Sequence, residues 1–234
     1  MWLRNELKEH AKSVLKVNYW WVIAALVIFM FSSRGVSSVS FFSVSVSDPD
    51  MMDRYLEDGP AVLGAFFVTA SLVATLLNTG ISTVLWCLVM NPLAVGTQRF
   101  LIRACKERAV LGEITYGFSR SYKNIVKTMF FRNLFTFLWS MLFVIPGIIK
   151  AYEYRMIPFI LAENPNIKME DAFALSQKMM DNEKWNTFIL DLSFIGWMIL
   201  GALSCGIFYI FYVKPYHQLT NAELYLVLKQ KISR

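Results

Sequence analysis

Five ionisable residues lie inside long apolar stretches of the sequence, where charged side chains are rare. They are Lys150, Glu153, Arg155, Asp191 and Lys214. A charge at membrane depth costs at least about 2.5 to 3.5 kcal/mol, so such a side chain usually faces an opposite charge or a wet cavity. We therefore expect Asp191 to pair with Arg155, with Lys214 or with both, and so to join the helices that carry them.

Two interpretations of these charges are open. They could form a structural ion pair, helped by side chains that extend toward the headgroups, or they could line a wet polar cavity for a substrate or for protons. From the helical rise, we place Arg155, Asp191 and Lys214 about 9 to 12 Å inside the cytoplasmic interface. At that depth either interpretation requires the charges to have polar partners.

Residue patterns typical of enzymes do not occur. The two histidines, His10 and His217, cannot form a zinc motif of the HExxH type, and no GxSxG, P-loop or GxGxxG pattern is found. Cys87, Cys105 and Cys205 show no CxxC spacing, and we interpret them as reduced packing or surface thiols. We predict no catalytic residue, no metal and no cofactor. A membrane enzyme that uses carboxylates alone stays an alternative.

The elements that must position these charges follow from composition. The chain has 234 residues, 56% of them hydrophobic and 17% charged, which is too apolar for a typical soluble domain. It predicts an all-α, polytopic bundle forming a single integral membrane domain over 1–234. The predicted spanning helices are 18–33, 61–96, 129–146, 147–163, 186–203 and 205–225. The amphipathic segments 1–17 and 168–184 are predicted to be interfacial helices.

Two segments have other possible interpretations. Charged residues before the first apolar run are typical of a signal peptide, but no A-x-A site follows, which favours a retained first helix. Residues 32–60 turn polar and then acidic, with a strand-like alternation at 36–47. We predict a solvated connector there, with a partner-docking loop as the alternative.

Basic residues flank the apolar windows and give a net charge of +6. This distribution favours contact with anionic lipid at the cytoplasmic face over nucleic acid. Only Arg34 and Arg54 fall on the large loop predicted outside, so the positive-inside rule places both termini in the cytoplasm with six spans. A four-span alternative would put 150–184 outside and export more basic residues.

Proline and glycine mark the predicted turns. Pro146 and Gly147 indicate a tight turn between two spans, whereas Asn91-Pro92 and Pro158 indicate kinks. Small residues at 201–206 favour a second hairpin turn. We interpret these positions as hinge or turn devices rather than gates.

Five short segments together resemble a known family. They are Asn91–Gly96 (NPLAVG), Phe137–Ser140 (FLWS), Ile145–Lys150 (IPGIIK), Ala162–Pro165 (AENP) and Leu192–Trp197 (LSFIGW). Over nearly the whole chain, the sequence resembles the bacterial integral membrane protein family catalogued as domain of unknown function 975. The resemblance implies fold and membrane location but no activity. Glu153 and Arg155 depart from the small, polar or apolar residues that the likeness leads us to expect there.

More distantly, the Pro-Gly hairpin followed by an amphipathic helix is similar to the membrane domain of some glycerophosphodiester phosphodiesterases, without a counterpart of their catalytic barrel. Three functions follow as hypotheses. The first is a non-enzymatic scaffold, accessory or protective factor in a bacterial cytoplasmic membrane, with a protein partner or a second copy. The others are a carrier or permease component and a lipid-processing enzyme.

Overall fold

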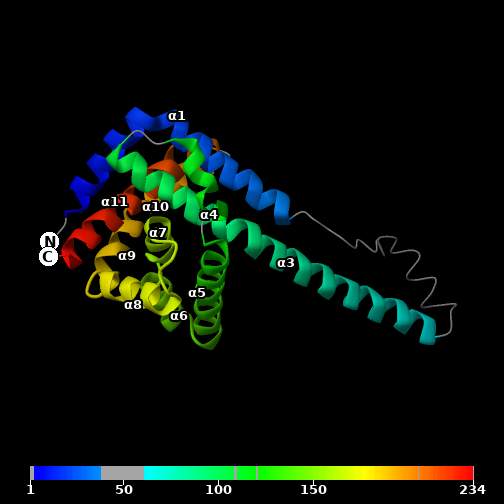
Figure 1. The fold of residues 1–234 in the computed structure, drawn as a ribbon. Helices are drawn as coiled ribbons and strands as arrows, with labels where there is room; N and C mark the ends of the chain where they lie inside the picture. The colour runs from blue at the N-terminus through cyan, green and yellow to red at the C-terminus, as the bar shows by residue number, and fades with distance from the viewer. Residues whose placement is uncertain (1–2, 38–60, 108–109, 120, 205, 234) are drawn as a thin grey trace. The chain divides into compact units, whose positions relative to one another are not determined.

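A computed structural model describes residues 3–37, 61–107, 110–119, 121–204 and 206–233. Within these residues the secondary structure is helical, with turns between the helices and no strand, so the predicted all-α class is confirmed. The chain divides into two compact units, residues 32–89 and residues 1–31 with 90–234. Each unit is described by itself, with the elements labelled in Figure 1.

Helix α1 (Arg4–Ser37) is bent at Asn18, whose φ and ψ of −110° and 20° are not helical. The bend falls between the predicted segments 1–17 and 18–33. The Asn18 amide donates to the carbonyl oxygen of Ala104 at 3.4 Å. Residues 32–37 continue the helix, which corrects the loop predicted there, because a polar composition without proline does not end a helix. The remaining 38–60, with most of the strand-like stretch, lies outside the described residues.

Helix α3 (Ala61–Lys106) is continuous through Gly80 and through Pro92. It corrects the predicted end at residue 96. In the unit 32–89, the described part of this helix exposes apolar side chains such as Leu76 and Leu77. Its Ser and Thr hydroxyls donate to backbone carbonyls one turn earlier, as Thr79 does to Thr75 at 2.8 Å. These hydroxyls therefore need no water, which suits an apolar surrounding.

Among the described residues, three helical segments are long and apolar enough to cross a membrane. They are Arg4–Met30, Thr69–Lys106 and Lys184–Leu203. This finding rests on length and composition and is compatible with a membrane location.

In the unit formed by 1–31 and 90–234, a helical hairpin follows two short helices, η1 (Leu111–Thr115) and α4 (Tyr116–Ser119). Helices α5 (Tyr122–Leu142) and α6 (Val144–Glu153) lie side by side (Figure 1). The turn between them is the extended residue Phe143, not Pro146-Gly147 as predicted. Pro146 falls in the first turn of α6, where its missing N–H costs little.

The predicted span 147–163 is divided. Helix α6 ends at Glu153, and α7 (Ile157–Glu163) begins after a turn at 154–156. Pro158 is the second residue of α7, so it starts a helix rather than kinking one. Proline fits this position because the N–H groups of the first helical turn have no intrahelical acceptor.

The second half of the unit starts with α8 (Met169–Met180), shorter than the predicted 168–184. The predicted span 186–203 divides at Ser193-Phe194 into α9 (Lys184–Leu192) and α10 (Ile195–Leu203). The chain then reverses at Gly206, whose φ is +82° and whose N–H donates to the Gly201 carbonyl at 3.0 Å. A positive φ favours glycine, which explains this residue at the turn.

The last predicted span, 205–225, is a π-helical turn η2 (Tyr209–Val213) followed by α11 (Lys214–Ile232). Helix α11 provides much of the core. Its buried residues include Leu219, Ala222, Leu224 and Leu228. Packing by the surrounding helices, rather than apolar composition, explains why the helix continues past residue 225 to Leu228, and its last turn, to Ile232, is largely exposed.

Candidate functional site

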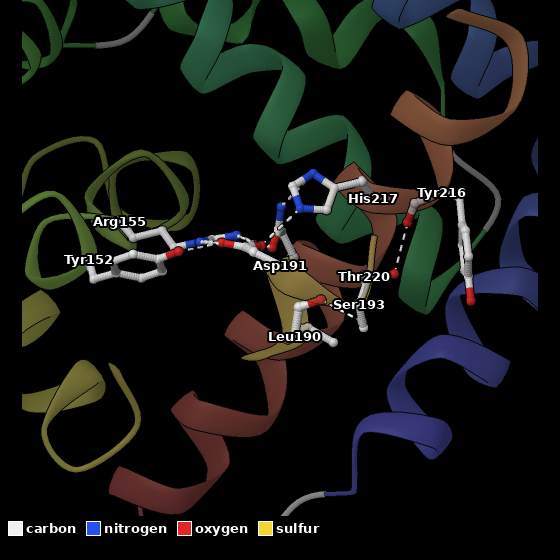
Figure 2. Close-up of polar contacts among 9 residues, drawn as sticks. Tyr152, Arg155, Leu190, Asp191, Ser193, Tyr216, His217 and Thr220 are labelled. Carbon is white, nitrogen blue, oxygen red and sulfur yellow. Dashed lines mark hydrogen bonds and ion pairs between the residues drawn. The ribbon is translucent and has the colours of Figure 1, made fainter. Parts of the chain in front are cut away.

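The centre of the polar cluster is an ion pair between α9 and the turn after α6. Arg155 donates through both terminal nitrogens to the carboxylate of Asp191, at 2.5 and 2.8 Å (Figure 2). The exposed fractions of the two side chains are 18% and 24%, so the pair is largely shielded. A bidentate guanidinium–carboxylate pair fixes orientation as well as charge, and so it holds these two segments in one relative position.

Three further side chains complete this Asp191 cluster, which we define as Asp191, Arg155, Tyr152, His217 and Asn221. The Tyr152 hydroxyl donates to Asp191 at 2.9 Å, and His217 Nε2 lies 3.0 Å from the other carboxylate oxygen. Arg155 also donates to Asn221 at 2.7 Å. The Asn221 amide lies 3.5 Å from His217 Nδ1. A histidine tautomer with its proton on Nε2 satisfies both of its contacts.

The Asp191 cluster joins three helical segments that the chain separates widely. Tyr152 comes from the end of α6 and Arg155 from the turn that follows, Asp191 comes from α9, and the histidine and asparagine come from one face of α11 at i, i+4 spacing. Phe194 packs edge-on against the ring of His217, with ring centroids 4.9 Å apart. This contact limits the rotation of the histidine next to the carboxylate.

The other predicted residues divide between a second cluster and a separate position. Glu153 lies 2.6 Å from both Lys150 and Lys184, and its backbone carbonyl accepts a 2.6 Å hydrogen bond from Ser176. We call this group the Glu153 cluster; it links α6 to α8 and α9. Lys214 is half-buried at the start of α11 and has no ion pair among the described residues. The structure thus pairs Asp191 with Arg155 and not with Lys214.

The predicted hinge residues are sites of close packing. At Gly147 an added Cβ would lie 2.5 Å from the Cα of Ser140, so glycine permits the tight contact of α5 with α6. At Gly117 an added Cβ would lie 2.2 Å from the carbonyl oxygen of Pro92. Asn91 is buried beside it. Pro92 therefore lies where α3 touches α4.

Two cavities formed by the described residues lie away from the Asp191 cluster. One, of about 490 Å³, is lined by Arg99, Arg103, Lys106, Glu163 and Lys229, and the other, of about 470 Å³, lies against Trp20 and Trp21. Among the described residues no group of three His, Cys, Asp or Glu side chains could hold a metal ion. In the first cavity, Glu163 accepts hydrogen bonds from Tyr225 and Lys229, so its charges are internally paired.

Sequence reasoning found the two charges at the centre of the Asp191 cluster and missed Tyr152, His217 and Asn221. His217 was considered only as a metal ligand. The i, i+4 spacing of His217 and Asn221 was the available signal, because two polar side chains on one helical face in a predicted span need a common partner. Tyr152 gave no such signal, since tyrosine is ordinary in apolar segments.

The fold and the site define a protein that is helical over the described residues, with membrane-length helices and an internally paired polar cluster. The family model described as "Protein of unknown function (DUF975)" matches residues 114–232, and the chain belongs to this family. The match covers α5 to α11 and includes every residue of the Asp191 cluster. No curated protein and no solved structure matches the chain.

Proposed function

We propose that this chain is an integral protein of a bacterial cytoplasmic membrane that acts by interaction, as a scaffold, accessory subunit or protective factor, and not as an enzyme. Its exposed side chains support this assignment. Large apolar residues are exposed on α3, α5, α6, α9 and α10, including Leu76, Met141 and Leu203. Exposed apolar surface of this extent is unfavourable in water and suits contact with lipid or with another membrane protein.

The observation that carries the non-catalytic role is the saturation of the Asp191 cluster. Each carboxylate oxygen has two partners, and the guanidinium of Arg155 also has a second acceptor, Asn221. A carboxylate that itself binds a substrate or exchanges protons with it needs a position open to that substrate, whereas here the oxygens are occupied by the protein itself. The cluster fits a role in holding helices together.

The proposed topology has six helical segments entering the membrane and both termini in the cytoplasm. The segments are α1 after Asn18, α3, α5, α6 with α7, α9 with α10, and η2 with α11. The six segments form three consecutive helical pairs. Both termini stay in the cytoplasm even if one pair does not cross the membrane completely, because a hairpin that turns inside the bilayer also returns to its starting side. Exposed basic residues at the end of α3 and in the first turns of α5, Lys106, Lys123 and Lys127, contact anionic headgroups in this arrangement.

Purification from native membranes in mild detergent tests the function. A protein partner that co-purifies in stoichiometric amount supports a scaffold or accessory role. Added free copies of that partner should displace it from the complex. A co-purifying small ligand or a chemically altered lipid contradicts it and favours transport or lipid processing. Asp191→Asn, with the exposed Asp171→Asn as the matched control, sharpens the result: loss of folded protein is expected for the first variant alone.

A carrier or permease component is the second candidate, and the partial exposure of the cluster favours it. The side chains of Arg155, Asp191 and His217 are 18%, 24% and 21% exposed, so water can reach the group. Proteoliposomes with a pH-sensitive dye inside would show proton movement that His217→Asn abolishes. Equal fluxes in wild type and variant exclude this candidate.

A further inference from the structure

The end of the α5–α6 hairpin is an uncharged cap. Residues 134–149, which we call the hairpin cap, contain no Asp, Glu, Lys, Arg or His. The cap's exposed apolar side chains are Phe135, Phe137, Leu138, Trp139, Met141, Leu142, Phe143, Val144, Ile145, Ile148 and Ile149. Nearly every large side chain of the cap is therefore exposed.

The backbone of the cap is suited to a site without water. Phe143, where the helix is interrupted, donates its N–H to the Trp139 carbonyl at 3.1 Å and accepts the N–H of Gly147 at 3.1 Å. Ser140 donates its hydroxyl to the Thr136 carbonyl at 2.8 Å. Irregular backbone is tolerated in hydrocarbon only when its polar groups have partners, and the interrupted residue meets this condition.

Charged residues border the hairpin cap on both of its helices. On α5, Arg132 donates to the backbone carbonyl of Tyr154 at 3.1 Å. On α6, Lys150 pairs with Glu153 at 2.6 Å, and Lys184 from α9 joins the same carboxylate. Charged groups gathered at one level of an otherwise apolar hairpin indicate contact with water or headgroups at that level.

The position of helix α8 indicates independently where the membrane surface meets the hairpin. Phe173 on α8 packs against Phe135 and Tyr154, with ring centroids 5.8 and 4.9 Å apart. The opposite side of α8 exposes Asp171 and Lys178, and Glu170 is exposed in its first turn. Since charged side chains of α8 require water or headgroups, the membrane surface lies near the contact of α8 with the hairpin.

The hairpin cap is too short to cross a bilayer from that level. Phe143 follows Arg132 by a helical length of about 16 Å and precedes Lys150 by about 10 Å. The hydrocarbon core is about 30 Å thick, which requires about 20 residues in each arm. The cap therefore reaches only about half of the core.

We propose that the α5–α6 hairpin enters the membrane from the cytoplasmic side and turns inside it, so that the hairpin cap docks into the acyl chains of one leaflet. The proposal rests on the membrane location proposed above and replaces two complete crossings by a re-entrant wedge. Its partner is lipid hydrocarbon, with phosphate headgroups at the level of Arg132 and Lys150.

Depth measurements in reconstituted vesicles test the proposal. Single cysteines replace the exposed Phe130, Phe137 and Phe143 in a background without the native cysteines and carry a bimane label. Phosphatidylcholine brominated at different acyl positions then reports depth by quenching. A wedge predicts progressively deeper labels from 130 to 143, with the label at 143 quenched most by bromines near the chain ends, at least threefold more than the label at 130. A complete crossing predicts the deepest label near 137 and a shallow one at 143, and would overturn the wedge.

A second measurement uses a milder substitution, in case the Phe→Cys variants fold poorly. Ser140→Cys nearly preserves side-chain volume, and a membrane-impermeant maleimide applied from outside is expected to leave it unlabelled, whereas Asp50→Cys in the segment predicted outside is labelled. Labelling of Ser140→Cys from outside contradicts the wedge while leaving the membrane assignment intact. Protein that fails to float with vesicles contradicts both. A label at 143 quenched by no brominated lipid indicates that protein covers the cap, and also overturns the wedge.

Discussion

The Asp191 cluster and the hairpin cap each include part of α6, through Tyr152 at its end and residues 144–149 at its start, and deal with apolar surroundings in opposite ways. In the cluster, charges are turned inward and joined by hydrogen bonds across three helical segments. In the cap, charges are absent and large apolar side chains are exposed, with Phe143 64% accessible. The comparison teaches that a shielded polar cluster can join three segments beside the apolar core, whereas the cap exposes large apolar side chains where a soluble protein more often has polar ones.

The largest effect is expected when one member of the central ion pair is removed. Asp191→Ala leaves Arg155 shielded without a carboxylate, which typically costs about 3 to 5 kcal/mol. Unfolding in detergent, followed by circular dichroism, measures the loss, with Asp171→Ala on the exposed face of α8 as the control. Equal stabilities of the two variants would remove the cluster from its structural role.

A smaller loss is expected from Gly147→Val at the α5–α6 contact. The new side chain meets the backbone of Ser140, and overpacking of this kind costs about 1 to 3 kcal/mol. Gly196→Ala is the control, because nothing lies within 4 Å of the Cβ added there. The melting temperature of each variant in the same detergent separates them. An unchanged value for Gly147→Val would show that the two helices can move apart freely.

The Glu153 cluster is expected to contribute less than the Asp191 cluster. Its lysines are more exposed than Arg155, at 27% and 34% for the side chains of Lys150 and Lys184, and accessible pairs contribute only about 0.2 to 1 kcal/mol. Glu153→Gln should therefore lower stability by about 1 kcal/mol, with a reduced effect in high salt. A loss as large as that of Asp191→Ala would reverse the ranking of the two clusters.

The smallest effect is expected in the cap. Met141, 78% exposed, contacts little protein, so Met141→Ser should change stability in detergent by less than about 0.5 kcal/mol. The same substitution should reduce partition into vesicles, because it replaces an apolar side chain at the lipid contact. Flotation with increasing lipid measures this. A variant that loses stability in detergent while binding vesicles normally would assign the cap to the protein core.

The helical class could be predicted from composition, and Arg155 and Asp191 from the rarity of charges in apolar stretches. The ends of the helices were harder to predict from the sequence. Pro146 indicates a turn by its type, yet it also fits the first turn of a helix, and the chain reverses at Phe143, which has no turn signature. Similarly, the break at 154–156 and the long α11 depend on packing against distant helices, which periodicity along the chain does not encode.

The ion-pair partner of Asp191 likewise could be predicted only in part from the sequence. Sequence reasoning left Asp191 with two candidate partners, because depth along a helix does not fix which helices touch. The choice of Arg155 over Lys214 follows from tertiary packing, in which α9 meets the end of α6. His217 joined the cluster only because α11 turns that face toward Asp191.

A double-mutant cycle on Arg155 and Asp191 tests the central claim most directly. The stabilities of Arg155→Met, Asp191→Leu and the double variant are measured in one detergent by reversible unfolding. We predict that each single variant is strongly destabilised and that the double variant recovers at least about 2 kcal/mol relative to the sum of the two, because it leaves no unpaired charge. Additive effects within about 0.5 kcal/mol would contradict the conclusion that this pair holds the helices together.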